Sequence, residues 1–98
     1  MKLWIDDLRP APFGWVWLKT VNEAIVRLKT AKNCGMTIEV ISLDHDAGDY
    51  FPLGGDYIKV LDWLEQESWS IPINLHSMNP VGVMNMRAII QKNGWKEV

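Results

Sequence analysis

Acidic residues, histidines and other polar residues follow three apolar stretches of the sequence, at the point where each stretch ends. Eight residues share this position: Asp6, Asp7, Asp44, His45, Asp46, His76, Ser77 and Asn79. Crowded carboxylates repel one another unless a cation neutralises them. Mg²⁺ and Mn²⁺ accept carboxylate ligands, and Mg²⁺ keeps coordination positions for water or for substrate phosphate. Imidazole exchanges protons near pH 7. These residue types therefore predict a site for a divalent cation and a phosphate group.

The four aspartates are the candidate metal ligands. Asp6 or Asp7, together with Asp44, supplies the one or two carboxylates that are typical of a magnesium site. Side chains alternate in direction along an extended segment, so Asp44 and Asp46 are expected to point together unless the chain turns there. One of Asp6 and Asp7 has the alternative role of capping the turn that follows.

The two histidines and Ser77 are the candidate catalytic residues, together with Asp44. His45 or His76 is expected to activate water or to protonate a leaving oxygen. The alternative for His45 is a half-buried ring bonded to a backbone carbonyl. Ser77 is expected to donate to a phosphate oxygen, and a nucleophilic role is less favoured because no serine elbow surrounds it.

Four residues are candidates for binding the phosphate: Arg9, Gly54, Gly55 and Asn79. Arginine binds phosphate bidentately, although Arg9 could equally pair with a neighbouring aspartate. Asn79 precedes Pro80 at a predicted helix start, whose first N–H groups attract anions. The alternative for Asn79 is plain capping. The two glycines allow close backbone approach, but glycines are also common in ordinary turns.

Stretches typical of strands alternate with stretches typical of helices. We expect five strands, at residues 2–5, 15–19, 38–43, 71–75 and 95–98. Thr20 and Glu23 form a capping box that begins a first helix. Asp56 is expected to cap a second helix, and Asn79 with Pro80 begins a third. This alternation predicts a parallel sheet with right-handed crossovers, in which ligands bind at the carboxyl ends of the strands.

One connection does not fit the usual pattern. About nine residues join the first two strands, fewer than the dozen or so that a parallel crossover usually needs. The pairing of strand 15–19 is therefore left open.

Length and composition limit the remaining choices. A chain of 98 residues is expected to form a single domain, 1–98. Its net charge is −2 and its ten Lys and Arg are scattered, which disfavours an extended nucleic-acid surface but not a phosphate-containing small molecule or an RNA end. The single cysteine, Cys34, fits a reducing, cytoplasmic location. Acids appear too early for a signal peptide, and no apolar run is long enough to cross a bilayer.

The tryptophans are expected to serve the core rather than to stack on bases. Trp15, Trp17, Trp63 and Trp95 are predicted to be buried. Trp69, which lies between two serines, is predicted to be exposed.

The order of elements resembles the receiver domain of two-component systems. The resemblance rests on IDD after the first strand, LD after the third and IPINLHS at the fourth. It implies an α/β, flavodoxin-like parallel sheet in the order 2-1-3-4-5. It also implies that Asp6, Asp7 and Asp44 hold Mg²⁺ and that Ser77 is the strand-four hydroxyl. Here only three helices are expected, because the first and last receiver helices are missing. The receiver lysine has only Lys96 as a weak counterpart.

A narrower group of receiver-derived domains is more similar still. The strings IDDLRP, LDHD, GGDY and LHSMNPVG resemble the cyclic-phosphate-processing receiver family. The resemblance implies a metal-dependent phosphoesterase that acts on a cyclic phosphate, on an RNA end or on a small nucleotide. Two alternatives stay open: a signalling receiver that is phosphorylated on Asp44, and a module that binds a cyclic nucleotide without turnover.

Overall fold

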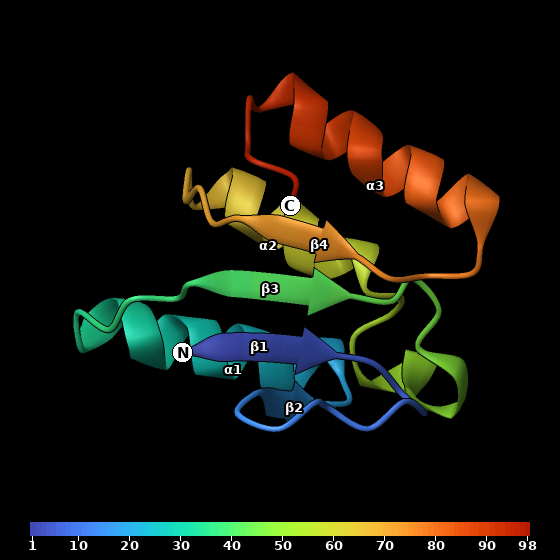
Figure 1. Ribbon diagram of the computed structural model, residues 1–98, viewed down its shortest axis with the longest axis horizontal. Coiled ribbons are helices and arrows are strands. Elements are labelled where there is room, and N and C mark those ends of the chain that lie inside the picture. Colours follow the sequence, from blue (N-terminus) through green and yellow to red (C-terminus); the bar gives the residue numbers. More distant parts are fainter.

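All 98 residues are described by the structure, a computed structural model, and they form a parallel sheet with helices on one side (Figure 1). The elements follow in the order β1 (Lys2–Ile5), β2 (Val16–Leu18), α1 (Val21–Asn33), β3 (Val40–Leu43), the 3₁₀ helix η1 (Gly48–Leu53), α2 (Ile58–Gln66), β4 (Ile73–Leu75) and α3 (Pro80–Lys92). The four strands are all parallel, in the order β2-β1-β3-β4. The predicted α/β receiver-like architecture with three helices is confirmed.

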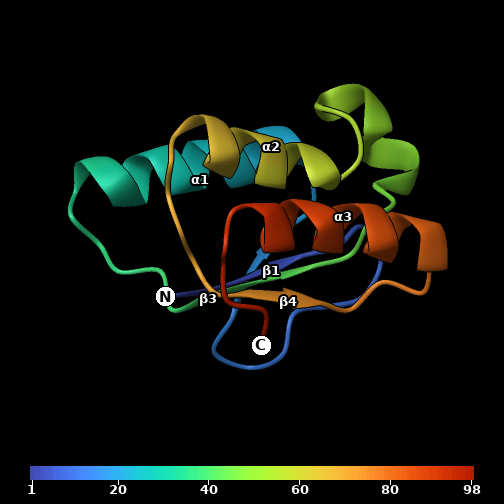
Figure 2. The ribbon, with the colours of Figure 1, turned by 90° about the horizontal axis from the view of Figure 1, so that it is seen from above.

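The three helices cover the same face of the sheet, as Figure 2 shows. The opposite face has no helix over it, and the loop between β1 and β2 passes on that side. The strand register assigns residues to the two faces, because paired residues of parallel strands point the same way. Leu3 and Ile41 face the helices, whereas Trp4, Trp17 and Ser42 face away from them. We call this second side of the sheet the open face.

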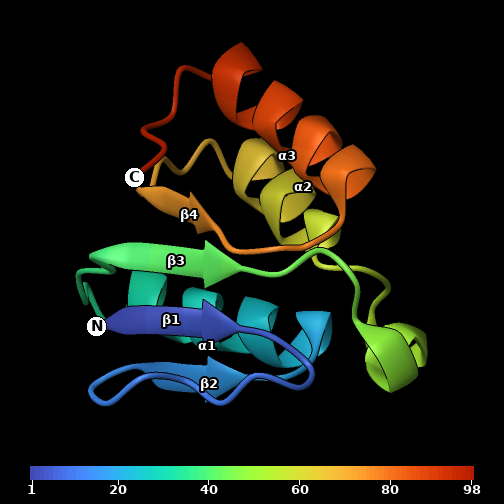
Figure 3. The same cartoon turned by 45° about the vertical axis from the view of Figure 1, so that its right-hand side comes forward.

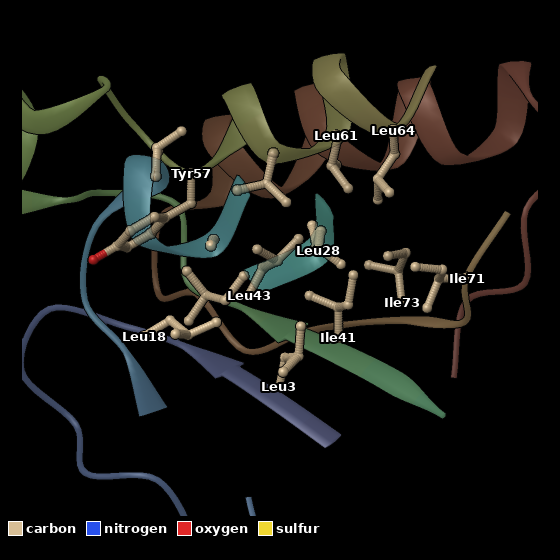
Figure 4. Packing of buried hydrophobic residues seen from close by; sticks show 14 of the residues in the cluster. Leu3, Leu18, Leu28, Ile41, Leu43, Tyr57, Leu61, Leu64, Ile71 and Ile73 are labelled. Carbon is tan, nitrogen blue, oxygen red and sulfur yellow. The ribbon is translucent and has the colours of Figure 1, made fainter. Parts of the chain in front are cut away.

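The hydrophobic core lies between the sheet and the helices (Figure 4). The sheet contributes alternate residues of each strand, such as Leu3, Ile5 and Leu43, all fully buried. Helices α1 and α2 supply Leu28 and Leu61 from their apolar stripes. Alternation along the strands therefore orients one set of side chains toward the core and the other toward the open face.

Two of the predicted helix starts are confirmed. Thr20 is the N-cap of α1, and its Oγ1 accepts from the Glu23 N–H at 2.9 Å. Asn79 is the N-cap of α3, and its Oδ1 accepts from the Gly82 N–H at 3.0 Å, with Pro80 as the first helical residue. The prediction for the start of the second helix, α2, is wrong. Asp56 does not cap α2, because its Oδ1 accepts instead from the Ala47 N–H at 3.0 Å.

The two edges of the sheet differ from expectation. The pairing of strand 15–19, which the sequence left open, is now defined: β2 pairs in parallel with β1 although no helix joins them. At the other edge, the expected strand 95–98 is reduced to a single bridge, between Ile73 and Glu97. The sheet therefore has four strands rather than five. Reaching across from α3, Arg87 makes an ion pair with Glu97 at 2.7 Å.

The tryptophans divide between the two faces. Trp63 and Trp95 pack against the core, as expected, and so does Trp69, which was expected to be exposed. Trp69 meets Trp63 edge to face, with ring centroids 6.3 Å apart. Trp15 and Trp17 do not belong to the core cluster, and the prediction that they are core residues is wrong. None of the helices has both the length and the hydrophobicity of a membrane-spanning segment.

The buried tyrosine of the core provides a test of the packing. The Tyr57 hydroxyl donates to the Lys19 carbonyl at 2.6 Å and so joins the start of α2 to the end of β2. Tyr57→Phe leaves that carbonyl without its partner, and we expect the free energy of unfolding to fall by about 1 to 3 kcal/mol. Tyr50→Phe is the matched control, because the structure gives that hydroxyl no hydrogen bond. Equal denaturation midpoints for the two variants would contradict this role of Tyr57.

Candidate functional site

The carboxyl ends of β1 and β3 lie side by side at one edge of the sheet (Figure 3), and three carboxylates converge there. Asp6 and Asp7 follow β1 and Asp44 follows β3, and each offers a carboxylate oxygen within 4.8 Å of the other two. Backbone hydrogen bonds hold the strand ends in register: the Asp44 N–H donates to the Ile5 carbonyl at 2.9 Å, and the Asp6 N–H donates to the Leu18 carbonyl at 3.2 Å. The predicted convergence of these three side chains is what the sheet geometry produces.

Asp6 is fully buried, and the protein holds its carboxylate with three hydrogen bonds. Its Oδ1 accepts from the N–H groups of Leu8 at 2.9 Å and Arg9 at 2.8 Å, and its Oδ2 lies 2.8 Å from His76 Nε2. Burial raises the pKa of the Asp6 carboxyl, but these hydrogen bonds and the charge of the histidine outweigh burial, and the pKa lies below its usual value. Asp6 therefore caps the turn after β1 and also presents a carboxylate to the group.

Asp7 is in the opposite situation. Burial raises the pKa of its carboxyl, and the neighbouring charges of Asp6 and Asp44 raise it further, against the effect of its own backbone N–H. Gly48, at φ +55°, passes so close that a Cβ there would overlap with Asp7 Oδ2. Asp7 is thus confined in a position where its negative charge is poorly compensated by the protein. A cation held there would supply the missing positive charge.

His76 is held by hydrogen bonds at both ring nitrogens. Nε2 faces the Asp6 carboxylate, which can only accept, so Nε2 carries a proton. Nδ1 lies 2.7 Å from Ser42 Oγ, and Ser42 Oγ in turn accepts from Asn74 Nδ2 at 2.8 Å. The ring also stacks on Trp4, with centroids 3.9 Å apart and planes 6° apart. In this arrangement His76 orients Asp6, and neither ring nitrogen is left free for a substrate.

His45 is arranged differently, with one nitrogen available. Its Nδ1 lies 2.7 Å from Asp46 Oδ1, and since that carboxylate can only accept, Nδ1 carries the proton. Nε2 has no hydrogen bond to the protein and can accept a proton. The ring packs against the first turn of α3, where a Cβ on Gly82 would overlap with it. Hydrogen bonds from His45 and Asn79 lower the pKa of the Asp46 carboxyl despite its partial burial.

Asp46 does not join the three-carboxylate group. It belongs to a second group with His45 and Asp56, whose ligand atoms lie within 4.8 Å of one another. In an extended segment, alternation would make Asp44 and Asp46 point together; here they do not. The chain turns after Asp44, whose Oδ1 accepts the very next N–H, that of His45, at 2.8 Å.

The remaining predicted residues lie around this edge in supporting positions. Arg9 donates from one guanidinium nitrogen to the His76 carbonyl at 3.0 Å and so bridges the ends of β1 and β4. Ser77 Oγ accepts from the Asn79 N–H at 3.1 Å, which leaves its hydroxyl proton free to donate. Asn79 caps α3 and also donates to Asp46 at 3.3 Å. Both roles considered for Asn79, capping and a place at the site, are compatible with this geometry.

The two glycines after η1 allow backbone conformations and close packing that other residues do not. Gly54, at φ +121°, packs against Val21 and Asn22 at the start of α1, where a side chain would overlap. Gly55 has φ +92°, and its N–H donates to the Phe51 carbonyl at 2.7 Å. Their phosphate-binding role stays a prediction.

Some residues that form the site carried no clear signal in the sequence. Ser42 and Asn74 lie within β3 and β4, and nothing in the sequence around them indicates a role at the site. Gly48 and Gly82 contribute by leaving room for the side chains of Asp7 and His45, respectively. Period-two alternation from Asp6 and His76 back along their strands could have indicated the open-face residues Trp4 and Asn74.

The lowered pKa of Asp6 makes a prediction for acid stability. A carboxyl whose folded pKa lies below its unfolded value of 3.8 stabilises the fold fully above that value, and the contribution is lost as the pH falls through the folded pKa. Asp6→Asn should lower the free energy of unfolding by about 2 kcal/mol at pH 7. The deficit should shrink below about pH 4. Glu39→Gln, an exposed control, should change little. A deficit that stays constant into acid would contradict the charged role of Asp6.

Comparison with known proteins agrees with this geometry. The family model described as the cyclic-phosphate processing receiver domain matches residues 1–92. No match was found among curated proteins or among solved structures. The match covers every strand and helix that positions the site, including the two aspartates after β1, the aspartate after β3 and both histidines. The chain therefore belongs to the family of cyclic-phosphate processing receiver domains.

Proposed function

We propose that this domain is a metal-dependent phosphoesterase that opens a cyclic phosphate, on an RNA end or on a small nucleotide. The observation that carries the proposal is the convergence of Asp6, Asp7 and Asp44, whose carboxylate oxygens lie within 4.8 Å of one another. Three such groups held together without a cation repel one another: burial raises the pKa of the Asp7 carboxyl, and the charges of Asp6 and Asp44 raise it further. The family description supplies the substrate class.

The donor set suits a hard divalent cation. All three groups offer carboxylate oxygen, and no sulfur or imidazole is among them, a pattern that favours Mg²⁺ or Mn²⁺. When bound, such a cation would neutralise phosphate charge and stabilise the additional charge that develops during hydrolysis. Asp7 and Asp44 are half-exposed and can reach a ligand, whereas Asp6 is buried and held from behind by His76.

Hydrolysis of a cyclic phosphate needs a proton carrier. Water adds to phosphorus, one ring P–O bond breaks, and the oxygen that leaves must receive a proton. His45 suits this task because Asp46 fixes its Nδ1 proton and leaves Nε2 as the acceptor. We assign His45 to accept the proton of water at Nε2 and to return it to the leaving oxygen. His76 is assigned a positioning role, since both of its nitrogens are engaged.

Three groups at the same edge are suited to hold the phosphate. Arg9 uses one guanidinium nitrogen for the His76 carbonyl and keeps its other N–H donors. The Ser77 hydroxyl retains its proton for donation. Asn79 begins α3, and the N–H of Val81 in that first turn makes no hydrogen bond within the protein. These donors complement the cation on the other side of the phosphate.

The proposal is tested by hydrolysis of 2′,3′-cyclic AMP with Mg²⁺ or Mn²⁺, followed by chromatography of the products. We expect metal-dependent opening that EDTA abolishes. Asp44→Asn and His45→Gln should each lower kcat by at least about 100-fold. Glu39→Gln, which removes one exposed negative charge elsewhere on the chain, should retain full activity.

Other results would replace the proposal. Tight calorimetric binding of the cyclic nucleotide without any product would indicate a sequestering module. Absence of turnover together with an acid-labile mass adduct on Asp44, after incubation with a small phosphodonor, would indicate a signalling receiver.

A further inference from the structure

The open face of the sheet carries a cluster of aromatic side chains that the site does not use. Trp4 on β1 and Trp17 on β2 are register partners and point the same way. Trp15, just before β2, meets Trp4 edge to face at 5.9 Å. Phe13 belongs to the loop between β1 and β2 and is 105% exposed. We call these four residues the aromatic face.

Two indole N–H groups of the aromatic face, those of Trp4 and Trp17, are already used within the protein. Trp4 Nε1 donates to the Arg9 carbonyl at 2.8 Å, and Trp17 Nε1 donates to the Asp6 carbonyl at 2.8 Å. Each ring is thereby fixed in orientation and presents carbon and π surface rather than a polar donor. Both rings remain half-exposed, because no helix covers this side. Rigid, accessible aromatic surface of this kind stacks on nucleobases.

Positively charged side chains flank the aromatic face. Lys2 places its Nζ 5.7 Å from the Trp15 ring, and Lys19 places its Nζ 4.4 Å from the Trp17 ring. Arg9 is exposed where the β1–β2 loop begins. Asp6 approaches this side, but it is buried and bonded to His76. Cations interleaved with aromatic rings complement a phosphate backbone and its bases.

The aromatic face is continuous with the candidate site. Trp4 stacks directly on His76, and His76 bonds to Asp6, one of the three converging carboxylates. Trp4 and Asp6 are also two residues apart on one chain segment, so their side chains leave it on the same side. A single-stranded nucleic acid lying on the aromatic face would therefore have its end at the three-carboxylate group.

We infer that the aromatic face binds the last bases of a single-stranded RNA, whose terminal cyclic phosphate enters the site. This inference rests on the proposed function for the chemistry of the strand's end, and it selects an RNA end over a free nucleotide as the substrate. The contact surface is short, because β1 and β2 span only four and three residues. It serves the end of a strand rather than a long stretch of nucleic acid.

The test compares a short 5′-labelled RNA ending in a 2′,3′-cyclic phosphate with 2′,3′-cyclic AMP. Fluorescence anisotropy gives the affinity for the strand, and chromatography gives the turnover of both. We expect the strand to bind more tightly than the mononucleotide. Trp15→Ala and Phe13→Ala should each weaken strand binding, by about tenfold for the tryptophan. Turnover of the mononucleotide should be unchanged in both variants. Phe51→Ala, an exposed aromatic on η1 at the helix side, is the matched control.

The outcomes separate this inference from the proposed function. Mononucleotide turnover without any preference for the strand overturns the inference and leaves the proposed function intact. Strand binding that depends on Phe13 and Trp15, without turnover of either ligand, supports the aromatic face and overturns the phosphoesterase. Dimerisation in sedimentation experiments that Trp15→Ala abolishes, with no strand binding, would show that the face is a protein interface and overturn the inference.

Discussion

The burial of one charged carboxylate, that of Asp6, is the constraint on which the site depends. A buried charge is tolerated only when hydrogen bonds replace the water it has lost. Here two backbone N–H groups and the His76 ring do so, and they keep the Asp6 pKa low. The same contacts tie the turn after β1 to the end of β4. With Asp6 fixed and charged, Asp7 and Asp44 are held beside it, and the proposed cation would relieve the repulsion among the three carboxylates.

The two histidines illustrate how similar residues acquire different tasks. Both have an aspartate at one ring nitrogen, at 2.8 Å for His76 and 2.7 Å for His45. The difference lies at the second nitrogen, which Ser42 occupies in His76 and which no protein group occupies in His45. The open face provides Ser42 because strand alternation points it away from the core. The absence of a helix there also leaves the tryptophans beside His76 accessible.

Much of the fold could be predicted from the sequence because its signals are local. The capping box at Thr20 and the Asn79–Pro80 start predicted two helices correctly. The ends of the first and third strands predicted the meeting of Asp6, Asp7 and Asp44. The role of Asp56 was missed, because a bond to the Ala47 N–H, nine residues away, diverts it from capping. The sequence left open whether the chain turns after Asp44; it does turn, and Asp46 bonds to His45. Trp15 and Trp17 were assigned to the core because aromatic content alone does not reveal that a sheet lacks helices on one side.

The claim that Asp6, Asp7 and Asp44 share one cation can be tested directly by crystallography with Mn²⁺, using its anomalous scattering to locate the ion. We expect a single strong peak bonded to carboxylate oxygens from these three residues, with the peak lost in Asp44→Asn. A peak held instead by His45, Asp46 and Asp56, or no peak at the strand ends at saturating Mn²⁺, would contradict it.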